Sequence, residues 1–152
     1  TADEKYEDAS GFSFMYPKGI VVSDDTPDDN TYYTLLTLTK EGKNLTISAL
    51  DTKETKVEDY IAKSEIYKTA TLYGATTLSD IPAKQYSTNE KLLTVSIDKE
   101  VLYLIEGPKD GGFWEETQTV IAGSFIFSGE TKATNGSATQ GNVIYEEEEV
   151  VE

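Results

Sequence analysis

Four aspartates stand close together in the segment 24–30, which reads Asp-Asp-Thr-Pro-Asp-Asp-Asn. Ca²⁺ prefers about six to eight oxygen ligands, and carboxylates with a nearby amide could supply several of them. The segment lacks the central Gly and the final Glu of an EF-hand loop. A solvated turn after a strand explains the same residues. The loop could bind Ca²⁺ or another small ligand, and we keep this as the alternative to the leading hypothesis given at the end of this section. The metal ligands would be Asp24, Asp25, Asp28 and Asp29.

Two pairs of adjacent carboxylates, Glu58-Asp59 and Glu115-Glu116, could in principle serve as general acid and base. Adjacent residues on a helix point in different directions, and first-turn positions favour acidic side chains because of the helix dipole. The segment 107–112 is rich in Gly and precedes a predicted helix, but it lacks the P-loop spacing. Asp110 in that segment would repel a phosphate, so a tight strand-to-helix turn is the better interpretation.

Several chemistries are excluded because their residues are missing. The chain has no Cys and no His, and all 13 basic residues are Lys. Thiol nucleophiles, Ser-His-Asp triads and histidine or thiolate metal sites therefore have no side chains to build them. We expect a protein that is not an enzyme and holds no cofactor, with Ca²⁺ as the one exception considered.

The charge balance points to protein partners. The 28 acidic residues outnumber the basic ones, and the net charge of −15 repels nucleic acid and anionic lipid. No apolar run is long enough to insert in a membrane. We expect partners to be proteins, including copies of the same chain, and expect neither nucleic acid binding nor direct membrane insertion.

The 152 residues are enough for one ordinary domain. Composition divides them into an N-terminal arm (1–10), a domain (11–128) and a linker with an acidic, β-prone tail (129–152). Thr1 begins directly in polar sequence, as the mature form of an exported chain could.

Hydrophobic periodicity predicts the elements of the domain. Alternation of Phe12, Phe14 and Tyr16 predicts a half-buried strand. Two hairpins are predicted, one from strands 32–38 and 44–50 and one from strands 92–97 and 101–105, with the last of these central in a sheet covered on both sides. Segment 69–91 is predicted to be extended with turns, and 124–127 to be a final strand.

Two helices are predicted from a period near 3.6. The first begins at a capping box, Thr55-Lys56-Val57-Glu58, and extends far enough to place Tyr67 on its apolar face. The second runs from Phe113 through Ile121. The order of elements, rich in hairpins, predicts an α+β fold with an antiparallel sheet flanked by helices and an extended C-terminal tail.

This order of elements resembles the PsbP-like family, which includes the extrinsic photosystem II protein PsbP and many exported bacterial proteins. The resemblance covers about residues 6–128 and implies an α/β/α sandwich around an antiparallel sheet. A photosystem role does not follow from the fold. The landmarks are Gly11-Phe12-Ser13-Phe14-Met15-Tyr16-Pro17-Lys18-Gly19, Asn44-Leu45-Thr46-Ile47, Val57-Glu58-Asp59-Tyr60, Val101-Leu102-Tyr103-Leu104, Trp114 and Ser124-Phe125-Ile126-Phe127.

The chain departs from plant PsbP in ways that favour the bacterial members. Ile20 stands where an aromatic residue usually follows the Pro-x-Gly turn, and the longer insertions of the plant proteins are missing. The resemblance therefore implies an exported protein of the extracellular space or cell envelope, with the thylakoid lumen as the less favoured location.

The tail supplies the candidate interface. Val143, Ile144 and Tyr145 form a β-prone run beyond a small, polar linker, and four consecutive glutamates follow them. Such a run could add a strand to the exposed sheet edge of a neighbour. A disordered acidic tail, or a linker to another part of a longer protein, explains the same residues. The leading hypothesis is a non-enzymatic interaction or assembly module of a surface, extracellular or membrane-associated complex, joined through this tail.

Overall fold

The computed structural model describes residues 3–127, which form ten strands and two helices. In chain order the elements are β1 (Asp3–Asp8), β2 (Phe12–Pro17), β3 (Val21–Asp24), β4 (Thr34–Lys40), β5 (Lys43–Asp51), α1 (Val57–Lys63), β6 (Thr71–Leu78), β7 (Ile81–Ser87), β8 (Lys91–Asp98), β9 (Val101–Pro108), α2 (Phe113–Ser124) and β10 (Ile126–Phe127).

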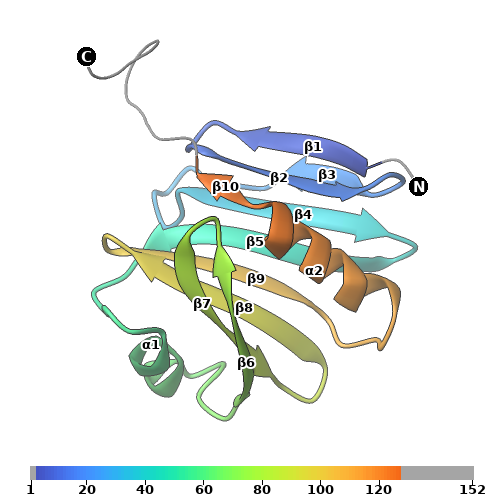
Figure 1. Ribbon diagram of the computed structural model, residues 1–152. Coiled ribbons are helices and arrows are strands. Elements are labelled where there is room, and N and C mark those ends of the chain that lie inside the picture. Colours follow the sequence, from blue (N-terminus) through green and yellow to red (C-terminus); the bar gives the residue numbers. More distant parts are fainter. Residues whose placement is uncertain (1–2, 128–152) are drawn as a thin grey trace.

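The strands form two antiparallel sheets (Figure 1). The large sheet has seven strands in the order β3-β4-β5-β9-β8-β7-β6, and the small sheet has three in the order β1-β2-β10. Both predicted hairpins are present, as β4-β5 and β8-β9. The return strand β9 lies at the centre of the large sheet, as its continuous apolar run predicted.

The two helices cover opposite faces of the large sheet. Side chains of β9 alternate between the two cores: Ile105 packs in the core with Trp114 of α2. Leu102 and Leu104 pack in the other core with Val57 of α1. The α+β class and the sandwich of helices around an antiparallel sheet are therefore confirmed, and the small sheet is an addition on the α2 side.

Aromatic packing joins the small sheet to the α2 side. Phe12 and Phe14 are almost fully buried, as their alternation predicted. Their rings stack with that of Phe125, at centroid distances of 5.0 and 6.2 Å. Tyr103 of the central strand meets the same ring edge-on. Aromatic pairs of this kind add stability beyond the area they bury.

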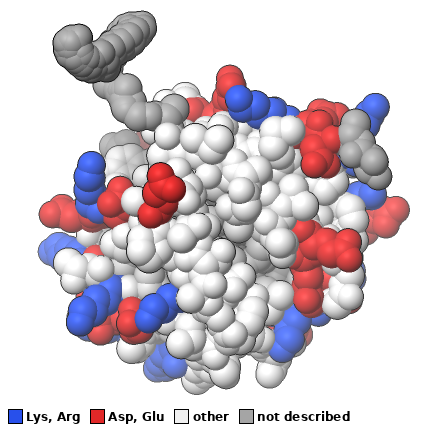
Figure 2. Space-filling model, viewed as in Figure 1, with Lys and Arg blue, Asp and Glu red and all other residues white. Residues whose placement is uncertain are grey.

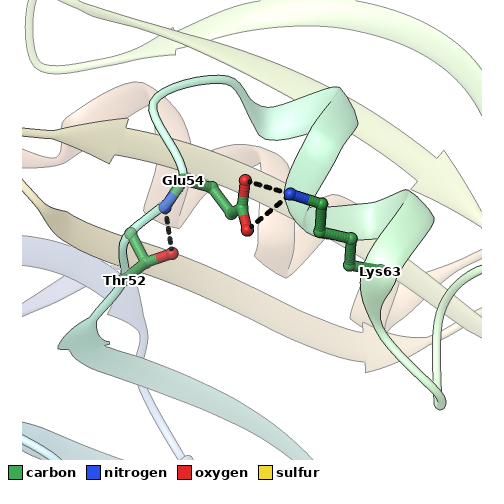
Figure 3. A network of polar contacts seen from close by, with 3 residues as sticks. All are labelled: Thr52, Glu54 and Lys63. Carbon is green, nitrogen blue, oxygen red and sulfur yellow. Dashed lines mark hydrogen bonds and ion pairs between the residues drawn. The ribbon is translucent and has the colours of Figure 1, made fainter.

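The α1 helix is shorter than the sequence predicted, and it has no capping box. Lys56 is the N-cap residue and makes no side-chain cap hydrogen bond. The preceding loop is fastened instead by Glu54, whose two carboxylate oxygens each accept a hydrogen bond of 3.1 Å from Lys63 in the last turn (Figure 3). Tyr67 lies beyond the helix in a turn, and its hydroxyl donates to Glu106 of β9.

The N-terminal residues differ from the predicted arm. Residues 3–8 form β1, which is paired along its whole length with β2. Its sequence, Asp-Glu-Lys-Tyr-Glu-Asp, has one large apolar residue and therefore no readable alternation. Segment 69–91 contains β6 and β7 and is therefore extended with turns, as predicted. The tail expected beyond residue 128 lies outside the described residues.

Candidate functional site

The acidic loop after β3 is organised by its own hydroxyl residues. Asp24 accepts hydrogen bonds from the backbone N–H and the hydroxyl of Thr26, at 3.1 and 2.6 Å. Asp29 accepts the same two bonds from Thr31. These are turns in which a short acidic side chain bonds to the backbone two residues on. They explain both aspartates as turn residues.

The remaining aspartates of this loop are also exposed. Hydrogen bonds from the hydroxyls of Thr37 and Ser23 lower the pKa of Asp25. Among residues 3–127 no group of three or more potential metal-ligating His, Cys, Asp or Glu side chains comes together. The structure thus does not bring Asp24, Asp25, Asp28 and Asp29 into one ligand set, and the Ca²⁺ alternative stays a prediction.

Asp110 occupies the N-terminus of α2. Its carboxylate accepts hydrogen bonds from the backbone N–H groups of Gly112, Trp114 and Glu115. Burial alone would raise the pKa of Asp110, but these bonds outweigh it and lower the pKa below its ordinary value. The segment before α2 is therefore a tight strand-to-helix turn, as the sequence indicated, and Asp110 caps the helix from it.

The paired carboxylates face different neighbours. Glu58 forms an ion pair of 2.7 Å with Lys84 on β7, and this hydrogen bond is the main cause of its lowered pKa. Glu115 accepts a hydrogen bond from the N–H of Gly111. One residue of each pair, Glu58 and Glu115, thus has a structural partner of its own.

A hollow of about 400 Å³ separates the β6-β7 side of the sheet from α2. It is lined by these side chains: Tyr73, Gln85, Ser87, Leu92, Lys109, Glu115, Gln118 and Thr119. Gln118 accepts a hydrogen bond from Thr94 and donates one to the carbonyl of Leu92, so its amide is already satisfied. This hollow lies beside the edge strand β6.

Strand β6 is the edge of the large sheet, with a neighbour on one side only. Its sequence, Thr-Leu-Tyr-Gly-Ala-Thr-Thr-Leu, contains no charged residue and no Pro. Leu72 and Tyr73 are 51% and 50% exposed, and Ala75 and Thr77 are exposed as well. Natural proteins usually protect such edges with charges, Pro or bulges. Here one irregularity, between Leu72 and Gly74, is the only such device along the strand.

The hairpin geometry shows which peptide groups of β6 face outward. A two-residue turn joins β6 to β7, and Leu78 and Ile81 form its closing pair. That pair exchanges both hydrogen bonds, and bonded and non-bonded pairs alternate along an antiparallel ladder. Pro82, which has no N–H, accordingly faces Thr77 at a non-bonded pair. The N–H and C=O groups of Thr77 and Ala75 therefore point away from β7, toward solvent.

The surface around β6 is also poor in charge. Figure 2 shows uncharged side chains over the middle of this view and most acidic and basic ones toward its rim. The first residue of β6, Thr71, lines a second hollow of about 470 Å³ together with Lys91, Lys109 and Glu90. Neither lysine has an ion-pair partner within residues 3–127. In the described part of the chain, two lysines without an ion-pair partner thus stand at the beginning of an uncharged edge; the Lys109 ammonium donates to the carbonyl of Thr88.

Sequence reasoning missed β6 as a site. The predicted interface, Val143, Ile144 and Tyr145, lies outside the described residues, so the structure does not place it. No sequence signal marked it, because an uncharged, Thr-rich run is not rare in this chain: residues 30–39 form a longer one.

The comparisons with known proteins bear on the fold. No protein-family model matches the sequence, and no curated protein matches it. Among solved structures, the solution structure of cyanobacterial PsbP (CyanoP) from Synechocystis sp. PCC 6803 is similar, with a TM-score of 0.53. The match covers 83% of this chain and 92% of that chain at 14% identity. The chain has the PsbP-like fold.

The PsbP-like fold found by structure is the one that the sequence landmarks predicted. At 14% identity the likeness concerns the fold alone. Neither helix within residues 3–127 has the length and apolar character needed to cross a membrane.

Proposed function

We propose that this protein is a non-enzymatic, exported interaction module that joins an assembly through strand addition. One observation supports the proposal: β6 is an edge strand of eight uncharged residues with outward-facing peptide groups. Main-chain hydrogen bonds at such an edge provide affinity, and neighbouring side chains provide selectivity. Leu72 and Tyr73 add exposed apolar surface at the same place.

The tail supplies the strand in this proposal. Val143, Ile144 and Tyr145 are β-branched or aromatic residues, the types enriched in strands. The partner is a protein, and copies of this chain qualify because each carries both a tail and an edge. Resemblance of the sequence landmarks to exported bacterial PsbP-like proteins supports a location in the cell envelope or outside the cell.

The test compares the full chain with a chain that lacks residues 141–152. Sedimentation velocity over a range of concentrations should show association of the full chain and a monomer after the deletion. Circular dichroism and the melting temperature should be unchanged by the deletion.

A matched control replaces Val150 and Val151 by Ser, which alters two β-branched residues of the same tail outside the donor run. This control should associate as the full chain does. Equal association of the deleted and full chains would contradict the proposed function.

A further inference from the structure

The edges of the two sheets differ in the charge that a tail strand would meet. The donor run is followed by four glutamates at 146–149. Strand β1 carries four acidic residues and one Lys, so it would repel them. Strand β3 has four residues and leads directly into the acidic loop, and β10 has two residues. Strand β6 is long and uncharged, and the two lysines near its beginning outnumber the one glutamate there, Glu90. Charge and length together select β6.

The position of those lysines sets the direction of the incoming strand. Lys91 and Lys109 stand near Thr71, where β6 begins. A donor running antiparallel to β6 passes Thr77 first and reaches the Thr71 end with the residues that follow Tyr145. A parallel donor would carry its glutamates toward the turn after Leu78, where Asp80 would repel them.

On the basis of the proposed function, we infer that β6 of one copy binds residues 143–145 of a second copy as an antiparallel strand. Glutamates 146–149 of the second copy then lie beside Lys91 and Lys109 of the first. Val143 then lies opposite Thr77, and Tyr145 lies opposite Ala75. Each of these pairs exchanges two backbone hydrogen bonds through the outward peptide groups.

The side chains fit this register. Val143 and Tyr145 lie on the same face as Ala75 and Thr77, whose small side chains leave room for the tyrosine ring. Leu72 is on that face too. It pairs with Tyr86 of β7 and Ala75 pairs with Lys84, and residues two apart on a strand share a face. Ile144 points to the opposite face, which carries the hollow beside α2.

The chain between the domain and the donor run is long enough to reach a neighbour. Fifteen residues, 128–142, lie between Phe127 and Val143, and they span roughly 50 Å when extended at about 3.3 Å per residue. A domain of this size is on the order of 35 Å across. The same length also reaches the chain's own β6, so the experiment must separate the two arrangements.

Disulfide cross-linking tests the register, because the natural chain has no Cys. One chain carries Thr77→Cys, and a second, tagged chain carries Val143→Cys. Cα atoms of a hydrogen-bonded antiparallel pair are about 5.5 Å apart, within disulfide range. Mild oxidation of this mixture should yield clearly more mixed disulfide dimer than oxidation of a control mixture of Thr71→Cys and Val143→Cys chains.

Two outcomes overturn the inference. One is equal or greater cross-linking of residue 143 to residue 71. The other appears in a single chain that carries both Thr77→Cys and Val143→Cys: an internally cross-linked monomer, in place of cross-linked dimers and larger oligomers, would mean that the tail binds its own domain.

Two further variants separate this inference from the proposed function. Thr77→Pro removes an outward N–H at an edge position that tolerates Pro, so it should abolish association with circular dichroism unchanged. Lys91→Glu with Lys109→Glu should weaken association about tenfold or more. Its control, Lys18→Glu with Lys53→Glu, makes the same change in net charge at exposed sites and should weaken it far less.

Should the tail deletion abolish association while Thr77→Pro leaves it intact, the proposed function stands and β6 is not the acceptor. Equal effects of the two lysine double variants would show that net charge alone matters, which overturns the pairing of the glutamates with Lys91 and Lys109.

Discussion

Replacing Gly107 by Ala should destabilise the protein, because the central strand has no room for a methyl group there. A Cβ at this position would lie 2.9 Å from Leu45 Cδ1 and 3.2 Å from Gln118 Nε2. Leu45 is fully buried. Gln118 is held between the Thr94 hydroxyl and the Leu92 carbonyl by bonds of 2.7 and 3.1 Å. Neither neighbour can retreat without loss of packing or of a hydrogen bond.

The expected cost follows from these contacts. Overpacking a core by one methyl group costs about 1–3 kcal/mol, and weakening one hydrogen bond of Gln118 adds about 1 kcal/mol. The lower conformational entropy of Ala in the unfolded chain offsets about 0.4–1 kcal/mol of this destabilisation. The free energy of unfolding should therefore fall by about 1–3 kcal/mol for Gly107→Ala.

Urea denaturation followed by circular dichroism measures this change, and the melting temperature should fall by roughly 4 °C for each kcal/mol. Gly123→Ala is the matched control, because Gly123 lies on the exposed side of α2 and a Cβ there would meet nothing within 4 Å. That variant should be more stable by up to about 1 kcal/mol. A Gly107→Ala protein as stable as the natural one would refute the steric reasoning.

Three other substitutions test the packing and the cap of α2. Trp114 is 3% exposed, so Trp114→Ala should lower the free energy of unfolding by about 3–5 kcal/mol, whereas Phe113→Ala, at a residue 36% exposed, should cost less than half as much. The pKa of Asp110 is lowered in the folded state. The stabilisation that its ionised carboxylate gives the folded protein is therefore complete above the ordinary carboxyl pKa, and it is lost as the pH falls through the folded-state pKa. Asp110→Asn should therefore reduce the acid dependence of stability in denaturation series at neutral and acid pH; an unchanged dependence would contradict this role for the carboxylate.

Much of the domain could be predicted from the sequence because burial imposes a pattern on it. Phe12 and Phe14 alternate with partly exposed residues, and the buried residues of α2 fall on one helical face. The hairpin β8-β9 was readable because both of its strands are rich in buried aliphatic residues.

The errors occur where tertiary pairing overrides local pattern. Strand β1 exists because β2 offers a full row of partners, although five of its six residues are charged. Tyr67 is buried by a turn and its bond to Glu106, so its apolar spacing was mistaken for helix.

The candidate edge could not be predicted, because a strand becomes an edge only through the strand order of the sheet. Segment 71–78 was recognised only as extended, and its irregularity near Tyr73 breaks the alternation that would have marked it. Pairing of β6 with β7 alone is a property of the whole seven-stranded arrangement.

The unequal edges of the large sheet have a consequence for growth. β3 is short and ends in an acidic loop, whereas β6 is long and uncharged, so within residues 3–127 the large sheet has one edge suited to receiving a strand. Each copy also has one tail to give. A head-to-tail contact of this kind is heterologous, and it closes into a ring or extends as a filament according to the rotation between successive copies. Polymers built this way would be unbranched and directional, with a vacant β6 at one end and an unused tail at the other.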